Sequence, residues 1–336
     1  MKARPMVELL DELKEGDPSK LPSTLSELCS YAEQGVYDPD VPLWLVKLID
    51  PCQDREVLVC ALRLVALYCL EGLIYPGITD AAVSILDHED DRVKAHAIYL
   101  LVVCAQRGMV RDSVLGRLVG FIDSGSLEAA LMAVEALIAY AEEGVTLPMV
   151  PDEAIRVLER GEYDLQASAI KLLSVYAERN ILDERFLKFA PLLLESEDEG
   201  VRLEAASCLW RYALRGVVST EALKPLLKVL EDDVFGVQAA AARVLWRYAE
   251  MGVGGRRAAD ELVRLLKCEK PFVRGVAVYT LLVYARRRVM SPLAAEALPA
   301  LLEDKEENIR KVALQAIEEY EKSGGLIEED DRSTSL

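Results

Sequence analysis

The chain carries VRLEAASCLWRYALRGV at residues 201–217, and residues 237–253 repeat the pattern as VQAAAARVLWRYAEMGV. The two stretches lie 36 residues apart, and both contain Trp-Arg-Tyr-Ala, at 210–213 and 246–249. Apolar residues within each stretch recur three, four and seven positions apart, which is the spacing of one buried face on an α-helix. The glycine near the end of each stretch suits a left-handed helix end. Each stretch therefore predicts one helix that ends at a glycine.

Related segments recur along the chain at nearly equal intervals. With Tyr212 taken as the anchor of its segment, the first spacing between anchors is 37 residues and the seven later spacings are 36. A fixed period of this kind is typical of stacked repeats, each of which forms one supersecondary unit. About nine units of 36 residues fill the sequence to roughly residue 325. The anchors are Tyr31, Tyr68, Cys104, Tyr140, Tyr176, Tyr212, Tyr248, Tyr284 and Tyr320.

Two columns of the repeat indicate how this helix packs and where it ends. The position seven residues before the anchor is Ala in eight units and Thr24 in the first, which predicts close approach of a neighbouring helix. The position four residues after the anchor is Gly in seven units. Asn180 and Arg288 take its place in two others. Asn suits the same left-handed end, whereas Arg288 predicts an end that is strained or differently closed.

Another helix is expected upstream of the anchor helix in each unit. A Leu or Ile stands 18 residues before the anchor in eight units, and an acidic turn such as residues 195–199 follows it. Carboxylates in that turn favour the N-terminus of the next helix. Each unit is thus expected to be an antiparallel helix pair. Because one pair cannot bury its own apolar face, stacking of the pairs must supply the core.

The stretch FAPLLLESEDEGVRLEAA at residues 189–206 resembles a HEAT repeat, and LPALLEDKEENIRKVA at 298–313 resembles one too. The resemblance implies an all-α, right-handed α-solenoid of about nine 36-residue helix pairs, with residues 1–325 as a single array. Residues 326–336 are acidic and are expected to form a disordered tail. HEAT arrays serve as scaffolds, adaptors, transport receptors and occasionally enzymes, so the resemblance implies a fold more than a function.

The composition narrows the class of protein. Its 336 residues are 52% apolar and include 39 basic and 57 acidic side chains, for a net charge of −18. That balance is globular and disfavours general coating of nucleic acid. Neither a secretory leader nor an apolar run of membrane-spanning length is visible, so a cytoplasmic protein that binds no membrane is expected. Abundant interspersed charges and the presence of only two Asn residues suggest a thermophilic source.

Residues suited to catalysis or metal binding are sparse. There are two histidines, His88 and His96, and the single His-Glu pair at 88–89 falls short of the several pairs found in HEAT-like di-iron hydroxylases. Seven scattered cysteines form no CxxC pair and predict small buried thiols, while any pairing among them stays open. We therefore expect no enzymatic activity, no cofactor and no metal. A HEAT-like enzyme or a lyase accessory subunit is a minor alternative.

The outward columns of the anchor helices indicate a binding surface. Positions nine, five and two residues before the anchor and two after it lie opposite the core face, and many are apolar here. The resemblance implies that these helices line a concave surface, where an apolar groove would accept an amphipathic helix or an extended peptide. Burial between tightly packed repeats is the alternative. The expected partner-binding residues, rich in the Trp, Tyr and Arg typical of interfaces, are Trp210, Arg211, Leu214, Arg215, Arg243, Trp246, Arg247 and Tyr279.

The charge is not uniform along the array. Residues 201–300 carry a net charge of +6, whereas the segments on either side are acidic. This basic block could bind an acidic protein, a nucleic acid or another anionic ligand, could receive the chain's own acidic tail, or could pair with neighbouring carboxylates. A non-enzymatic scaffold or adaptor with a protein or peptide partner is the leading hypothesis, and nucleic-acid or anion binding through residues 201–300 is the alternative. The anion-binding candidates, two of which follow the glycine-rich loop 252–255, are Arg256, Arg257, Arg286, Arg287 and Arg288.

Overall fold

The computed structural model describes residues 4–124 and 126–323. The regular secondary structure of these residues consists of α-helices and two short 3-10 helices without a strand, which confirms the predicted all-α repeat fold. The acidic tail predicted at residues 326–336 lies outside the described residues. The chain divides into two compact units, of which unit 1 ends at Arg179 and unit 2 begins at Asn180. Among the described helices, none is long and apolar enough to cross a membrane.

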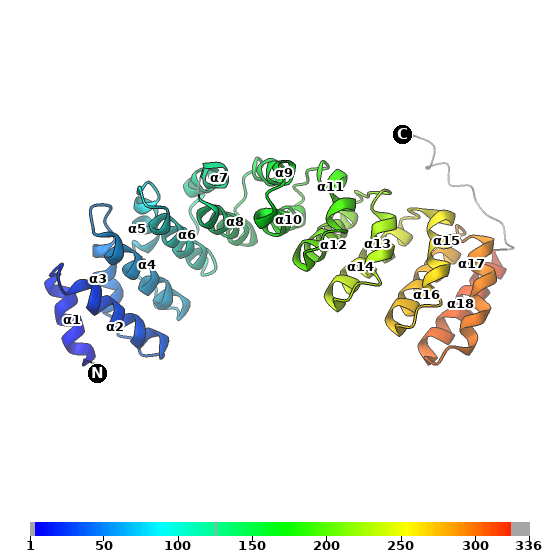
Figure 1. Cartoon of the computed structure of the whole chain (residues 1–336), viewed down its shortest axis with the longest axis horizontal. Helices are drawn as coiled ribbons and strands as arrows, with labels where there is room; N and C mark the ends of the chain where they lie inside the picture. The colour runs from blue at the N-terminus through cyan, green and yellow to red at the C-terminus, as the bar shows by residue number, and fades with distance from the viewer. Residues whose placement is uncertain (1–3, 125, 324–336) are drawn as a thin grey trace. The chain divides into compact units, whose positions relative to one another are not determined.

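Unit 1 consists of helix pairs in which a shorter first helix precedes a longer second helix (Figure 1). The first helices are α1 (Met6–Glu15), α3 (Val41–Leu48), α5 (Ile78–Ile85), α7 (Leu115–Ser124) and α9 (Val150–Arg160), and the 3-10 helix η1 (Asp112–Val114) leads into α7. The second helices are α2 (Leu21–Glu33), α4 (Arg55–Leu70), α6 (Asp91–Ala105), α8 (Leu127–Glu142) and α10 (Tyr163–Glu178).

Unit 2 continues the same alternation. Its first helices are α11 (Phe186–Leu193), α13 (Leu223–Val229), α15 (Gly255–Leu265) and α17 (Pro292–Ala297), the last of which runs into the 3-10 helix η2 (Leu298–Glu303). Its second helices are α12 (Glu199–Leu214), α14 (Phe235–Glu250), α16 (Pro271–Arg286) and α18 (Glu307–Lys322). Every anchor residue falls near the end of a second helix, so the helix pairs follow the 36-residue units of the sequence.

Second helices pack against their own first helices and against the second helices of adjacent repeats. In unit 2, α12, α14, α16 and α18 lie side by side as one row, and the first helices form another row (Figure 1). In unit 1, α2, α4, α6, α8 and α10 form the equivalent row of second helices. Alanines of the column seven residues before the anchor, such as Ala205 and Ala241, are completely buried, as the close packing predicted for this column requires.

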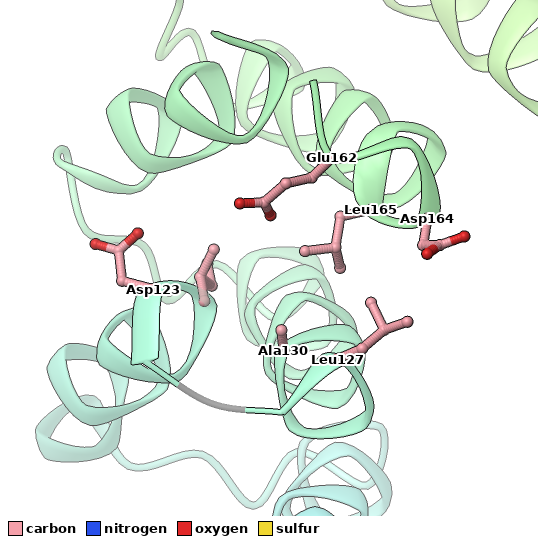
Figure 2. Close-up of a pocket in the computed structure, with 7 residues that line it drawn as sticks. Asp123, Leu127, Ala130, Glu162, Asp164 and Leu165 are labelled. Carbon is pink, nitrogen blue, oxygen red and sulfur yellow. The ribbon is translucent and has the colours of Figure 1, made fainter. Parts of the chain in front are cut away.

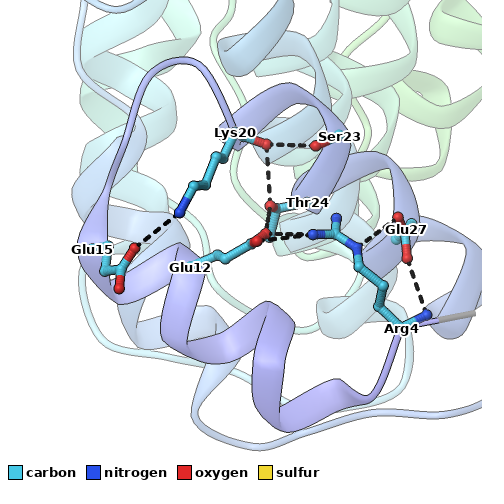
Figure 3. Close-up of polar contacts among 7 residues, drawn as sticks. All are labelled: Arg4, Glu12, Glu15, Lys20, Ser23, Thr24 and Glu27. Carbon is cyan, nitrogen blue, oxygen red and sulfur yellow. Dashed lines mark hydrogen bonds and ion pairs between the residues drawn. The ribbon is translucent and has the colours of Figure 1, made fainter.

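The first repeat replaces this alanine with a polar side chain that has its own partners (Figure 3). Thr24 is completely buried, and its hydroxyl donates a hydrogen bond of 2.6 Å to Glu12. Glu12 also pairs with Arg4 at 2.8 Å, and Arg4 reaches Glu27 at 3.0 Å (Figure 3). The hydrogen bond from Thr24 lowers the pKa of Glu12 and so favours its ionised form. A polar network thus takes the place of the alanine contact in the first repeat.

Second helices end in the same way across the repeats, with a left-handed residue four positions after the anchor. Gly216 (φ 83°) ends α12, and its amide and the next amide both donate to carbonyls in the last helical turn. Asn180 has a φ of 63°, which confirms the prediction made for it. Arg288 has a φ of 60° and makes the same two hydrogen bonds at the end of α16. The backbone strain expected at Arg288 is therefore present, but the different closure considered for it is wrong.

The anchor tyrosines hold each repeat to the loop before it. The buried hydroxyl of Tyr248 accepts a hydrogen bond of 3.0 Å from the amide of Ser219. Tyr284 reverses the direction and donates to the carbonyl of Val253 at 2.7 Å. Burial raises the pKa of Tyr248 to about 12, so its hydroxyl stays protonated at neutral pH. Bonds equivalent to that of Tyr248 join Tyr68 to Asp38, Tyr176 to Leu147 and Tyr212 to Asp183.

Arginines near the start of second helices join neighbouring repeats of unit 2. Arg274 in α16 makes a bidentate pair with Asp304 at 2.7 and 3.0 Å, and the remaining guanidinium nitrogen donates to two carbonyls of its own interhelix turn. Arg202 and Asp232 form the same arrangement one period and more upstream. At the equivalent position of α14, Gln238 donates its side-chain amide to the carbonyl of Asp232. These bonds connect the turn of one repeat to that of the next.

Replacing Tyr248 with Phe tests the tyrosine tether. The variant keeps the ring but leaves the amide of Ser219 buried without a partner, so we expect the free energy of unfolding to fall by about 1–3 kcal/mol. Chemical denaturation followed by circular dichroism measures the change. Tyr320→Phe is the matched control, because the Tyr320 ring is only partly buried and its hydroxyl has no hydrogen bond with a described residue. The control should change stability by about 0.5 kcal/mol or less, and equal losses in the two variants would contradict the tether.

The Arg274–Asp304 pair predicts a pH-dependent contribution to stability. The hydrogen bonds from Arg274 lower the pKa of Asp304 in the folded chain below its unfolded value of about 4. The pair therefore stabilises the fold above about pH 4, and this contribution is lost as the pH falls through the folded pKa. We expect the difference in melting temperature between the wild type and Arg274→Gln to shrink as the pH falls from about 6 to about 3.

The control for this measurement is Arg264→Gln. Arg264 pairs with Glu231 at 3.4 Å, and both side chains are more than 40% exposed, so the pair should contribute little at any pH. A difference between the wild type and Arg274→Gln that stays constant over the same pH range would show that ionisation of Asp304 is not involved.

Candidate interaction face

The structure separates the outward columns of the second helices into buried and exposed positions. Residues two positions before the anchor are buried in most repeats, as Val102, Ile138 and Leu282 show. The long apolar groove considered from the helical wheel is therefore interrupted, and burial between repeats is the correct interpretation for this column. The exposed apolar positions are those five residues before and two after the anchor, namely Leu70, Tyr99, Leu214 and Tyr279.

The two tryptophans of the buried column are only partly buried. Trp246 in α14 contacts Tyr279 in α16, with 5.3 Å between the ring centroids and 61° between the ring planes. This edge-on geometry is favourable for aromatic pairs. Tyr279 is itself 40% exposed, so the pair presents aromatic surface on two adjacent helices. The indole N–H of Trp246 is buried and has no hydrogen-bond partner among the described residues.

Trp210 is covered in a similar way. The guanidinium carbon of Arg243 in α14 lies 6.0 Å from the ring centroid of Trp210 in α12, which is the range of a cation–π contact. In both cases the covering side chain stands 33 residues after the tryptophan, on the next second helix. We call Trp210, Arg243, Trp246 and Tyr279 the tryptophan ladder. A helical wheel describes one helix and misses this contact, although the offset of 33 residues is visible in the sequence.

The other predicted partner-binding residues border the ladder and differ in what they do. Leu214 is 41% exposed at the end of α12. Arg247 donates to a carbonyl in the last turn of α12 at 3.3 Å and pairs with Glu250 at 3.2 Å, so it helps to hold α14 against α12. Arg211 is partly buried, and Arg215 is exposed. The structure thus brings the predicted residues together on α12, α14 and α16.

The predicted anion-binding residues are divided between two elements. Arg256 and Arg257 are exposed in the first turn of α15, and residues 286–288 are exposed at the end of α16. Arg287 donates to a carbonyl at the end of α14, so it has a structural role. The glycine-rich loop before α15 has a packing explanation, because a Cβ atom at Gly254 would lie 2.6 Å from the side chain of Leu223.

Much of the positive charge of residues 201–300 is paired within unit 2. The bidentate pair of Arg274 and the surface pair of Arg264 each engage one carboxylate of the same unit. Lys270 donates to the carbonyl of Asp232 at 2.9 Å. Pairing with neighbouring groups, one of the alternatives considered for this block, therefore accounts for part of its charge.

The larger hollow of unit 1 lies between α7, α8 and the start of α10, with a volume of about 340 Å³ (Figure 2). Asp123, Glu162 and Asp164 lie around it (Figure 2). Arg160 pairs with both Asp123 and Glu162 at 2.5 Å. Two of the three carboxylates thus have a charged partner already and serve to hold α7 and α9 together.

A smaller hollow of about 260 Å³ lies on the second helices of unit 1 and is lined in part by His96 and Tyr99. His96 Nδ1 lies 2.8 Å from the carbonyl of Arg92, and His88 Nδ1 accepts a hydrogen bond from the amide of Asp90. Within residues 4–124 and 126–323, no group of three or more His, Cys, Asp or Glu side chains is arranged to hold a metal ion.

Comparison with known proteins agrees with this architecture. The family model for HEAT repeats matches residues 186–282 and, in an overlapping second match, residues 223–318. No curated protein matches the sequence. Among solved structures, the crystal structure of an engineered protein aligns with a TM-score of 0.64 at 21% identity, over 95% of this chain and 92% of that chain.

Two further solved structures align less closely. A second engineered protein covers 76% of this chain and 100% of its own length, at 22% identity and a TM-score of 0.39. A designed armadillo repeat protein covers 72% and 99%, at 20% identity and the same TM-score of 0.39. The 36-residue period, the stacked helix pairs and the HEAT-repeat match over residues 186–318 lead to one conclusion, which is that this chain is a member of the HEAT-repeat family of α-solenoids.

Proposed function

We propose that this chain is a non-enzymatic scaffold or adaptor that binds an acidic segment of a partner protein on the second helices of unit 2. The tryptophan ladder is the observation that carries the proposal. It places large, partly exposed side chains from three adjacent helices next to one another. Trp, Tyr and Arg are also the residues that most often dominate the binding energy of protein interfaces.

The chemistry of the ladder favours a partner with both apolar and acidic side chains. Tyr279 and Leu214 are about 40% exposed and would pack against apolar side chains of the partner. The guanidinium of Arg243 is exposed beside Trp210 and would pair with a carboxylate. The buried indole N–H of Trp246 would gain an acceptor if Tyr279 rotated away on binding.

A displayed library of random peptides, selected on the full-length chain, provides a defined ligand for the test. We expect the recovered peptides to combine acidic and apolar residues. Their affinity is then measured by fluorescence anisotropy on the wild type and on Tyr279→Ser, Leu214→Ser and Arg243→Ser. Each variant should weaken binding about tenfold or more, which corresponds to a loss of about 1.4 kcal/mol.

Leu192→Ser is the matched control, because Leu192 is 73% exposed on the first helix α11 and lies outside the row of second helices. It should bind the recovered peptides as the wild type does. Recovery of peptides without acidic residues, or binding that all three ladder variants leave unchanged, would refute the proposal. Salt-sensitive binding of single-stranded DNA or RNA that Arg256→Gln and Arg288→Gln abolish would favour the anion-binding alternative instead.

A further inference from the structure

Two adjacent columns of the repeat are each interrupted by a cysteine in unit 1. The anchor is Tyr in eight of the nine repeats and Cys104 in the third. The residue after the anchor is Ala in seven of the nine repeats and Cys69 in the second. The two exceptions therefore fall in consecutive repeats.

The structure brings these two exceptions into contact. Cys69 lies at the end of α4 and Cys104 at the end of α6, and these two second helices pack against each other. Both residues are completely buried, and their thiols share a side-chain hydrogen bond. The third repeat also lacks the tyrosine hydroxyl that elsewhere holds a repeat to the preceding loop. A pair of thiols thus stands where the other repeats have a Tyr and an Ala.

We propose that Cys69 and Cys104 are a site of oxidative modification, at which a disulfide forms and links the second repeat covalently to the third. The oxidant is a small peroxide. The thiolate of Cys69 attacks the O–O bond of hydrogen peroxide, and Cys69 becomes a sulfenic acid while hydroxide leaves and is protonated to water. The sulfur of Cys104 then attacks the sulfur of Cys69, the S–O bond breaks, and a second water forms with the thiol proton. Two thiols are oxidised, and one peroxide is reduced to two waters.

The hydrogen bond within the pair assigns the two roles. It lowers the pKa of Cys69 and, together with burial, raises that of Cys104, so Cys69 is the better source of thiolate. The other cysteines are less suited to the reaction. Burial raises the pKa of Cys29 to about 11 and also raises that of Cys60, the cysteine near it. Burial raises the pKa of Cys208 well above its ordinary value.

The test oxidises the reduced full-length chain with hydrogen peroxide, blocks the remaining thiols with an alkylating agent and maps the digested protein by mass spectrometry. We expect a peptide that links Cys69 to Cys104. The oxidised chain should also melt roughly 5–10 °C higher than the same chain in reductant, because the link closes a loop of the unfolded chain. The difference in melting temperature between oxidised and reduced samples is the readout, so the absolute stability of a variant does not matter.

Variants that restore the repeat columns supply the controls. Cys69→Ala and Cys104→Tyr each introduce the residue that the same column carries in most other repeats, and both should lose the redox-dependent shift. Cys208→Ala should keep it. The oxidation is repeated in urea below the unfolding transition, so that exclusion of peroxide from the core does not explain a negative result. Thiols of Cys69 and Cys104 that remain free under both conditions, a link only between Cys29 and Cys60, or a shift that survives in Cys69→Ala would overturn the proposal.

Discussion

The buried hydroxyl of the anchor tyrosine is the interaction on which the stacking of repeats most depends. An α-solenoid contacts only its neighbours, so its stability is set by how well each repeat is joined to the next. The loops between repeats carry backbone groups that the core would otherwise leave unpaired. In Tyr248 a single side chain fills the core with its ring and pairs the amide of Ser219 with its hydroxyl. Apolar packing and loop geometry are thereby determined by one residue, which explains why the tyrosine recurs at the most regular position of the sequence.

Much of the fold was predictable because a repeated sequence shows the same physical constraint many times. One glycine is ambiguous, but seven at the same offset indicate a left-handed helix end, and Asn180 could be assigned to that conformation by comparison with them. The hydroxyl bonds of the tyrosines were not predictable in this way. Periodicity tells which face of a helix is buried, whereas the partner of a polar atom depends on a loop about 30 residues away. Arg288 shows the same limit, since the backbone bonds at its helix end outweigh the strain of its side chain.

The candidate face was predicted in its residues but not in its shape. A helical wheel treats the two flanks of a helix as open, whereas each second helix of a row has another on either side. Those neighbours bury Leu282 and the other aliphatic residues of its column. Trp210 and Trp246 are larger than the residues that this space accommodates elsewhere, so part of each ring emerges and is covered by a side chain of the next helix. The ladder thus results from an oversized residue in a buried column, which the sequence shows only when two helices are considered together.

Departures from a repeat column carry more information than the column itself. Thr24 replaces an alanine where Glu12 and Arg4 can receive a hydroxyl, and Gln238 replaces an arginine but still bonds to the turn of its own repeat. In both cases the exception is matched by a partner. Cys104 would otherwise be the least favourable exception, because it removes both a ring and a hydroxyl from the core of the third repeat. That Cys69 departs from its own column at the place where the two side chains meet argues that the two positions act as a pair. For a chain whose repeats are nearly identical in length and pattern, such paired exceptions are where specific function is best sought.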